Sequence, residues 1–228
     1  MNLSMRLNAV KDMVIPSDLV CDIGCDHGFV SIALAKEGKA KTVLACDINK
    51  GPLSACSEHI KEAGLEGTVI PRLSDGLSKV LPSEAPDAVI IAGMGGALIT
   101  KILEQGREKL YKVKQLVLSP QSEQFLVRKW LRENGYNIVS EKTMTDLGKF
   151  YFIIDARPGR SEKHDEETEE IYDMFSEYLI KTKDSLLREY LQKGLSNNKG
   201  YLEGISGDKR EVLIQKNQMI EKALSMME

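Results

Sequence analysis

The chain has 228 residues, which is long enough for one complete α/β domain and a smaller appended unit. Its hydrophobic (42%) and charged (29%) fractions are those of a soluble globular protein. No apolar run approaches the ~20 residues of a membrane span, and the N-terminus lacks a signal-peptide pattern. We therefore expect a cytoplasmic protein without a membrane segment. The net charge of −3 does not indicate a general nucleic-acid binder, so such binding would require a local basic patch.

The four cysteines are Cys21, Cys25, Cys46 and Cys56, and no two of them form a C-x-x-C pair. They fall in predicted strands, a turn and a helix. This arrangement favours reduced thiols over disulfides or zinc ligands. We expect no metal site.

The first predicted element is a short helix over residues 3–14, whose apolar residues recur at spacings of four, three and four. Arg6 lies off that apolar face, next to the start of the first predicted strand. It is either a solvated charge or a residue of a functional site.

The stretch from Leu19 to Gly28 (LVCDIGCDHG) is an apolar run that breaks into glycine, acid and histidine. This is typical of a buried parallel strand that ends in a turn close to a ligand. Gly24 and Gly28 allow positive φ and a close approach of the backbone. Residues 29–36 then predict a helix. A strand, a glycine turn and a helix N-terminus together form a nucleotide-sized pocket.

The glycine spacing differs from the dinucleotide fingerprint, because Asp26 stands where the second glycine would admit a pyrophosphate. Asp22 adds a second negative charge. The pocket therefore favours a ligand that is neutral or cationic near the turn, and S-adenosylmethionine fits that description. An ordinary βα turn in another α/β protein is the alternative, and an NAD-dependent dehydrogenase is disfavoured.

A second strand, predicted over residues 42–48, carries Asp47 near its end. An acid about twenty residues after the glycine turn is placed to accept the ribose hydroxyls of a nucleoside. Alternatively, Asp47 is a turn residue or a helix N-cap. Asn49 follows, and the next helix begins after it.

The third and fourth strands are predicted over residues 68–73 and 87–92. The loop after the third contains Asp75, which could accept a hydrogen bond from an adenine amine, and Gly76. Gly93-Met94-Gly95-Gly96 follows the fourth strand. So many glycines at a strand end indicate that a bulky or planar group approaches the backbone. Met94 either flanks a ring or fills the core.

The rest of the domain continues the alternation, with a helix over 97–108, a strand over 115–118, and a helix whose Phe125, Leu126 and Trp130 are expected to face inward. Two strands over 136–140 and 150–156 form a predicted hairpin. We predict an α/β fold with a Rossmann-like, doubly wound sheet and an antiparallel edge strand.

After residue 157 two long amphipathic helices around a Gly/Ser/Asn loop (194–207) predict an antiparallel coiled-coil hairpin. Its basic residues near the loop either contact RNA or are simply solvated; they are Lys193, Lys199, Lys209 and Arg210.

Five motifs together resemble the bacterial tRNA methyltransferases that act on N1 of adenine 22. They are DIGCDHG at 22–28, D-x-N-K-G-P at 47–52, RLSDGL at 72–77, IAGMGG at 91–96 and GKFY at 148–151. The resemblance implies a class I S-adenosylmethionine-dependent domain over 1–157, with seven strands and an antiparallel last strand, and a helical hairpin over 158–228 that could contact tRNA. Ser119-Pro120-Gln121 departs from the Gln-Pro-Asn of many members, so no role is transferred there.

The resemblance also implies site residues. Those expected around S-adenosylmethionine are Asp22, Gly24, Cys25, Asp26 and Gly28 at the methionine moiety, Asp47, Ile48 and Asn49 at the ribose, Asp75 and Gly76 at the adenine, and Gly93, Met94 and Gly95 toward the target base. Candidate catalytic residues are Asp26, His27 and Met94, and candidate tRNA contacts are Arg6, Lys129 and Arg132. Further clusters that could contact phosphates are 36–41, 109–114 and 128–132.

We expect a monomer that methylates tRNA. Two alternatives remain open: a methyltransferase for another RNA adenine or a small molecule, and a non-catalytic S-adenosylmethionine-binding RNA module.

Overall fold

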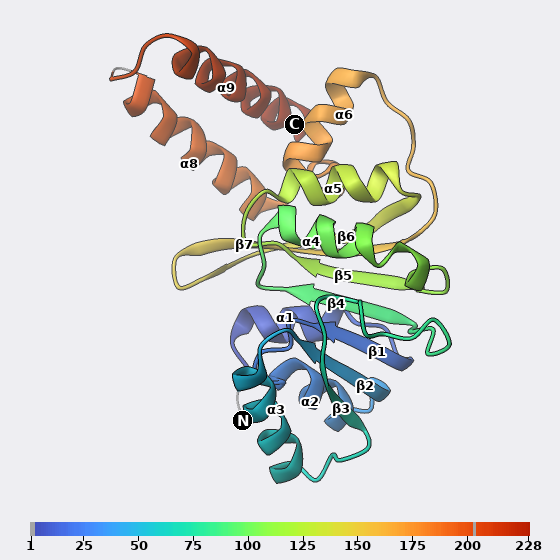
Figure 1. Ribbon diagram of the computed structural model, residues 1–228. Coiled ribbons are helices and arrows are strands. Elements are labelled where there is room, and N and C mark those ends of the chain that lie inside the picture. The colour runs from blue at the N-terminus through green and yellow to red at the C-terminus, as the bar shows by residue number, and fades with distance from the viewer. Residues whose placement is uncertain (1–2, 203) are drawn as a thin grey trace.

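The computed structural model describes residues 3–202 and 204–228 and is built around a seven-stranded sheet with the order β3-β2-β1-β4-β5-β7-β6 (Figure 1). The strands are β1 (Ser17–Ile23), β2 (Ala40–Asp47), β3 (Val69–Leu73), β4 (Ala88–Ala92), β5 (Gln115–Ser119), β6 (Tyr136–Asp146) and β7 (Lys149–Pro158). Strand β1 lies between β2 and β4, where Cys21 is in register with Leu44 on one side and Val89 on the other. The strand order reverses at β1, so the carboxyl ends of β1 and β4 flank a topological switch point.

The predicted doubly wound sheet is confirmed, but the antiparallel strand is not at its edge. Strand β7 runs antiparallel between β5 and β6, with Leu118 opposite Ile154, and β6 forms the edge. Strand β6 also extends to Asp146, six residues beyond the predicted end at 140, because it pairs with β7 along a long hairpin.

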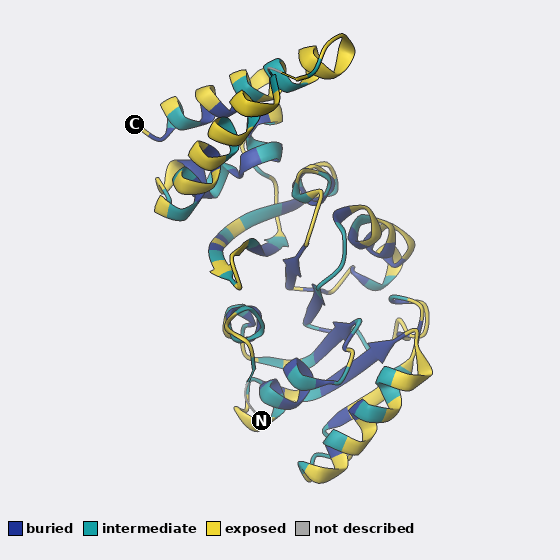
Figure 2. Cartoon of the chain, turned by 90° about the vertical axis from the view of Figure 1, so that its left-hand side faces the viewer, coloured by how far each residue is buried: buried dark blue, intermediate teal, exposed yellow. Residues whose placement is uncertain are grey.

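Helices cover both faces of the sheet. They are α1 (Met5–Met13), α2 (Phe29–Lys36), α3 (Lys50–Glu62), α4 (Gly96–Gln105), the 3-10 helix η1 (Arg107–Lys109), α5 (Gln124–Glu133), α6 (Glu166–Phe175), α7 (Glu177–Lys181), α8 (Ser185–Leu202) and α9 (Asp208–Met226). One core cluster joins the sheet to α1, α2 and α3, and another joins its opposite face to α4 and α5. Buried residues therefore line the central strands on both faces (Figure 2), which explains their continuous apolar sequences.

Helix α5 turns a different face to the core from the one predicted. It begins at Gln124, and its fully buried residues are Val127 and Leu131, while Phe125 is 38% exposed. The prediction for Phe125 is therefore wrong. Trp130 is buried as expected and donates from Nε1 to a Glu104 carboxylate oxygen at 3.0 Å.

The C-terminal helices form a third core cluster, which includes Phe152 of β7. Helices α8 and α9 run antiparallel, as predicted, since Arg188 donates to the Met227 carbonyl and Asn198 donates to Asn217. The predicted loop over 194–207 is wrong, because α8 continues to Leu202. Gly194 lies against Ile220 of α9, where its small size suits close helix packing. In Figure 1 the two helices project away from the sheet.

A buried ion pair fastens the C-terminal helices to the sheet domain. The guanidinium of Arg128 on α5 donates to Glu141 of β6 at 2.7 Å, and the two side chains are only 3% and 0% exposed. Its Nη1 donates to the carbonyls of Asp173 and Met174 at the end of α6. The position of α6 is therefore tied to hydrogen bonds from Arg128.

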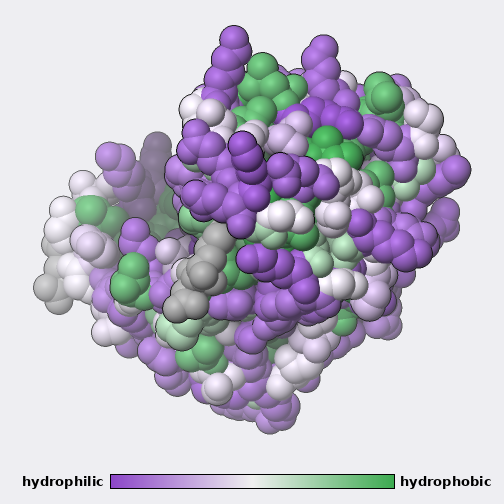
Figure 3. Space-filling model, turned by 90° about the horizontal axis from the view of Figure 1, so that it is seen from below, coloured by the Kyte–Doolittle hydropathy of each residue, from purple (hydrophilic) through white to green (hydrophobic). Residues whose placement is uncertain are grey.

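The face that carries α3 and β3 is mostly hydrophilic, with scattered hydrophobic side chains (Figure 3). Among the described residues, no helix combines the length and apolarity that crossing a membrane requires.

Candidate active site

A cavity of about 520 Å³ lies at the carboxyl ends of β1, β2 and β4. It brings together most of the residues predicted for the site. Those that line it are Arg6, Asp22, Gly24, Cys25, Asp26, His27, Asp47, Ile48, Asn49, Asp75, Gly76, Gly93 and Met94. Gly28 and Gly95 are not in the lining. Lys129 and Arg132 also lie elsewhere.

Asp47 fixes the glycine turn. One of its carboxylate oxygens accepts the backbone N–H of Asp26 at 3.0 Å, and the other accepts the N–H of Asn49 at 2.8 Å. Asp26 adopts φ +53°, a left-handed conformation that aspartate tolerates better than most residues. The Asp26 side chain is 70% exposed at the rim of the cavity, whereas Asp47 is buried. The acid at the end of β2 therefore shapes the loop that follows β1.

Asp22 is a buried carboxylate at the end of β1. Ser31 of α2 donates its hydroxyl to Asp22 at 2.6 Å. Burial, reinforced by the negative charge of Asp47, raises the pKa of Asp22 to about 6 despite that hydrogen bond. A cationic group in the cavity would favour the ionised form of Asp22.

Two glycines of the turn make room for neighbouring side chains. Gly24 has φ +73°, and a Cβ there would collide with the Met94 methyl group. Gly28 precedes α2 with φ +75°, and a Cβ there would collide with the Cys56 sulfur. Met94 therefore packs directly on the glycine turn. Gly28 leaves room for Cys56 of α3 and does not form part of the cavity surface.

His27 belongs to an aromatic group at the rim of the cavity. Its ring stacks 5.7 Å from that of Phe29, which in turn stacks 5.1 Å from His59. His59 Nδ1 lies 3.0 Å from the His27 carbonyl oxygen. Sequence reasoning missed Phe29 as a lining residue, because it reads as an ordinary first residue of the helix.

Arg6 and Gln121 lie on the side of the cavity toward β7. Both side chains approach Gly93, since a Cβ there would lie 3.7 Å from Gln121 Nε2 and 3.9 Å from Arg6 Nη2. The Arg6 guanidinium lies 5.4 Å from the centre of the Tyr151 ring. Within the described residues its Nη1 is buried without a hydrogen-bond partner. The Arg6 donor is thus available to a ligand.

Further lining residues, to which the sequence assigned no role in the site, include Leu7, Ser74, Leu98, Ile102 and Gln121. Most of them are apolar or common loop residues without a local signal. For Gln121, the only sequence signal of a place in the cavity is that it follows the end of a predicted strand.

The charge of the lining restricts the ligand. It carries four carboxylates, from Asp22, Asp26, Asp47 and Asp75, and one guanidinium among the described lining residues. Such a lining repels a pyrophosphate and suits a nucleoside that carries a positive charge. This agrees with S-adenosylmethionine, and the cavity volume is in the range of small-molecule sites.

Arg132 and Lys129 lie on α5, apart from this cavity. Arg132 is paired with Asp173 at 2.6 Å and with Glu169 at 2.8 Å, so its charge is already compensated. Arg128, from the same predicted basic cluster, is buried against Glu141. Its interpretation as a phosphate contact is wrong. Lys129 is exposed.

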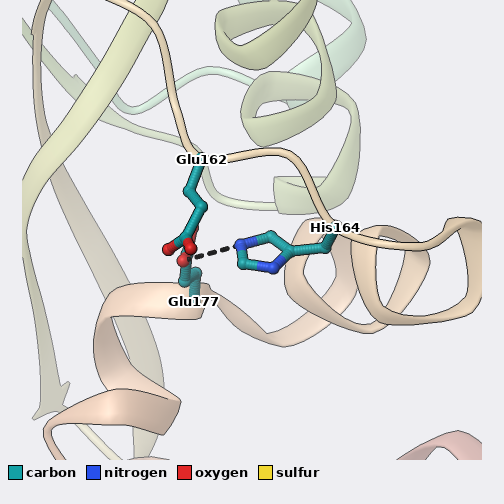
Figure 4. A group of neighbouring side chains, drawn as sticks. All are labelled: Glu162, His164 and Glu177. Carbon is teal, nitrogen blue, oxygen red and sulfur yellow. Dashed lines mark hydrogen bonds and ion pairs between the residues drawn. The ribbon is translucent and has the colours of Figure 1, made fainter.

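A second polar cluster lies where the segment after β7 meets α7. The donor atoms of Glu162, His164 and Glu177 all fall within 4.8 Å of one another (Figure 4). His164 Nε2 is 3.1 Å from Glu177, but the Lys181 ammonium is closer, at 2.6 Å, and also reaches Glu162 at 3.4 Å. The Lys181 ammonium therefore compensates part of the charge of the two carboxylates and joins the segment after β7 to α7.

The profile of a family described as "Methyltransferase domain" matches residues 3–154, which include α1, β1 to β5 and every residue that lines the cavity. The chain belongs to this methyltransferase-domain family.

Relatives of this chain include the tRNA (adenine(22)-N(1))-methyltransferase of Bacillus subtilis, which is 34% identical over 159 residues. That alignment covers 70% of this chain and 66% of the relative, slightly under two thirds of its length. The crystal structure of the B. subtilis m1A22 tRNA methyltransferase, TrmK, superposes with a TM-score of 0.86 at 25% identity, over 98% of this chain and 99% of that one.

A second solved structure, M. capricolum TrmK, contains S-adenosyl-homocysteine, its cofactor product. It superposes with a TM-score of 0.87 at 27% identity and covers 99% of both chains. The likeness therefore extends through the C-terminal helices as well as the methyltransferase domain.

Proposed function

We propose that this methyltransferase transfers the methyl group of S-adenosylmethionine to N1 of adenine 22 in tRNA. The observation that carries the proposal is the likeness to the B. subtilis m1A22 enzyme over nearly the full length of both chains. The four-carboxylate cavity adds independent support, because it suits a cationic nucleoside.

In this proposal different residues bind different parts of the cofactor. Asp22, Gly24, Cys25 and Asp26 hold the methionine moiety, and Gly28 supports the turn. Asp47, Ile48 and Asn49 contact the ribose, Asp75 and Gly76 contact the adenine, and Gly93 and Met94 separate the cofactor from the target base. Both oxygens of Asp47 already accept backbone N–H groups, and each retains a lone pair for a ribose hydroxyl.

The reaction makes a limited chemical demand on the protein. S-adenosylmethionine supplies an electrophilic methyl group on a sulfonium. Neutral adenine N1 presents a lone pair, so no side chain needs to remove a proton before attack. The main task is to align the target base, which can supply as much as ~7–11 kcal/mol of the barrier reduction. Carboxylates at the rim, such as Asp26, then stabilise the positive charge that develops on the purine.

Arg6 and Gln121 are the residues best placed to orient the base. They approach Gly93 from the side of β7, and Arg6 offers a donor that the described residues leave unpaired. His27 could stack on the target base at the rim. Met94 packs on Gly24, so we assign it to the wall of the cavity rather than to chemistry.

A direct test combines cofactor binding with turnover. We expect the protein to bind S-adenosylmethionine in calorimetry and to convert adenosine to 1-methyladenosine in a tRNA transcript. Cofactor binding without methylation of any RNA would overturn the proposal and favour a binding module.

A further inference from the structure

Two more cavities lie between the candidate active site and the C-terminal helices. The first, of about 510 Å³, lies beside Gln121, which also lines the cofactor cavity, and is bounded by Lys149, Phe150 and Tyr190. The second, of about 220 Å³, shares Phe150 and Tyr190 with the first. Because neighbouring cavities share lining residues, the three cavities lie side by side. We call the two outer cavities together the aromatic groove.

The groove is built where α8 lies against β7. The Tyr190 ring meets Phe150 edge-on at 5.3 Å and Phe152 edge-on at 5.4 Å. Phe152 is buried in the core of the C-terminal helices, whereas Tyr190 is 37% exposed. Buried residues thus fix the position of an exposed aromatic surface. In Figure 1 the β6–β7 hairpin and α8 project on the same side of the molecule.

Lysines gather along this groove. Lys149 lines the first cavity, and Lys193 and Lys216 line the second. The Lys193 ammonium lies 5.8 Å from the centre of the Phe150 ring. Among the described residues that line the two cavities there is no aspartate or glutamate. This is unexpected in a chain with 34 acidic residues and a net charge of −3, and it makes the groove a local basic surface.

The local structure of α8 presents these groups together. Tyr190, Lys193 and Asn197 follow one another at spacings of three and four, and therefore share one face of the helix. Leu187 and Leu191 on the adjoining side of α8 are fully buried in the core, and Leu191 also lines the second cavity. The direction of the groove-facing side chains is consequently set by packing.

We propose that the aromatic groove binds the RNA strand that flanks the target nucleotide. A base next to the target stacks on Phe150 and Tyr190, and Lys149, Lys193 and Lys216 contact the adjoining phosphates. Aromatic rings beside a basic channel are the usual means of holding unpaired nucleotides. Gln121 lines both the first outer cavity and the cavity of the candidate active site, which places this strand next to the site of methyl transfer. The inference rests on the proposed function, because it requires an RNA substrate.

The test measures RNA binding separately from methyl transfer. The affinity of full-length protein for a tRNA transcript is measured with S-adenosyl-homocysteine present, and the affinity for S-adenosyl-homocysteine alone is measured by calorimetry. The variants are Tyr190→Ala, Tyr190→Phe and Lys193→Ala. Tyr201→Ala and Lys199→Ala are matched controls, since both residues lie on α8 and line neither cavity.

Tyr190→Ala should weaken RNA binding by about tenfold or more, because one stacked base contributes that much, and Tyr190→Phe should retain binding. Lys193→Ala should reduce the slope of log affinity against log salt by about one. The affinity of every variant for S-adenosyl-homocysteine should be unchanged, and both control variants should keep the RNA affinity of the wild type. The proposal is overturned if Tyr190→Ala and Lys193→Ala bind RNA with wild-type affinity. It is also overturned if the control variants lose as much RNA affinity as these two.

These outcomes are distinct from a failure of the proposed function. A wild-type protein that binds the transcript but forms no methylated nucleoside contradicts the function and leaves the groove variants interpretable. If the wild type methylates the transcript and the variants bind RNA as the wild type does, only the proposed role of the aromatic groove is contradicted.

Discussion

The carboxylate of Asp47 accepts the backbone N–H of Asp26 at 3.0 Å and so joins the end of β2 to the glycine turn after β1. Asp26 is held in a left-handed conformation at this point. One acidic side chain thereby shapes the loop expected at the methionine moiety while it lines the cavity expected to hold the ribose. Cofactor affinity and turn geometry should therefore depend on the same residue.

Asp47→Asn tests this coupling. Asparagine has one acceptor oxygen, so either Asp26 or Asn49 loses its hydrogen-bond acceptor. We expect the free energy of unfolding to fall by about 1–3 kcal/mol and affinity for S-adenosylmethionine to fall by at least about tenfold. Denaturant unfolding and calorimetry measure the two effects. Asp18→Asn, at the exposed opposite end of β1, is the control; it should cost less than about 1 kcal/mol of unfolding energy and leave the affinity unchanged. Weakened ligand binding with an unchanged unfolding energy would contradict the coupling.

Gly24→Ala tests the close approach of Met94. The new methyl group would collide with Met94 and would also sit at φ +73°. We expect clear destabilisation and loss of cofactor binding. Gly38→Ala has a similar φ of +68° but open space around it, so it should cost only about 1 kcal/mol of backbone strain. Gly24→Ala/Met94→Ala should recover part of the difference. Equal costs at the two glycines would show that packing at Gly24 is unimportant.

Asp22 should make the stability of the ligand-free protein depend on pH. Its pKa rises from 3.8 to about 6 on folding, so the folded state binds this proton more tightly than the unfolded state. The ionised form therefore destabilises the fold, with a cost that grows from about pH 4 to pH 6 and reaches about 3 kcal/mol above it. Asp22→Asn should remove that cost.

The measurement is the unfolding energy of Asp22→Asn at two pH values. The variant should be more stable than the wild type at pH 7.5, and the gain should shrink at pH 4.5. It should also bind S-adenosylmethionine more weakly, and wild-type affinity should fall as the pH drops below 6. A variant that is destabilised equally at both pH values would contradict the burial argument.

Arg128→Met should loosen the C-terminal helices. It leaves Glu141 buried without its partner and removes the donors to the end of α6. Breaking one side of such a pair typically costs about 3–5 kcal/mol. Chemical denaturation measures the loss, and hydrogen exchange should accelerate first in α6. Lys41→Met breaks an exposed pair with Asp18 and should cost less than about 1 kcal/mol. Slow exchange in α6 of the Arg128 variant would count against this role.

Much of the candidate site could be predicted from sequence because its signals are local. The strand, the glycine turn and the acid at the end of the next strand lie within 19–47, and their order determines where they meet. Gln121 and Phe29 were missed because their roles depend on how β5 and α2 are placed. Gly28 and Gly95 were assigned to the ligand, but each instead makes room for a side chain, of Cys56 and Ser122 respectively.

The C-terminal part was less predictable because its decisive contacts are distant in sequence. Arg132 resembles a free basic residue until Glu169 and Asp173 fold against it. The stretch after Gly194 has the composition of a loop, yet packing against Ile220 and the bond between Asn198 and Asn217 keep it helical. Tertiary contacts here override local propensity.

Methyl transfer to adenine 22 can be tested with two tRNA transcripts that differ only in carrying adenine or guanine at position 22. Each is incubated with the protein and methyl-labelled S-adenosylmethionine, and the labelled nucleosides are identified by mass spectrometry. We expect 1-methyladenosine from the adenine transcript and no label in the guanine transcript. Label in both transcripts, or in neither while S-adenosylmethionine is bound, would contradict the proposed function.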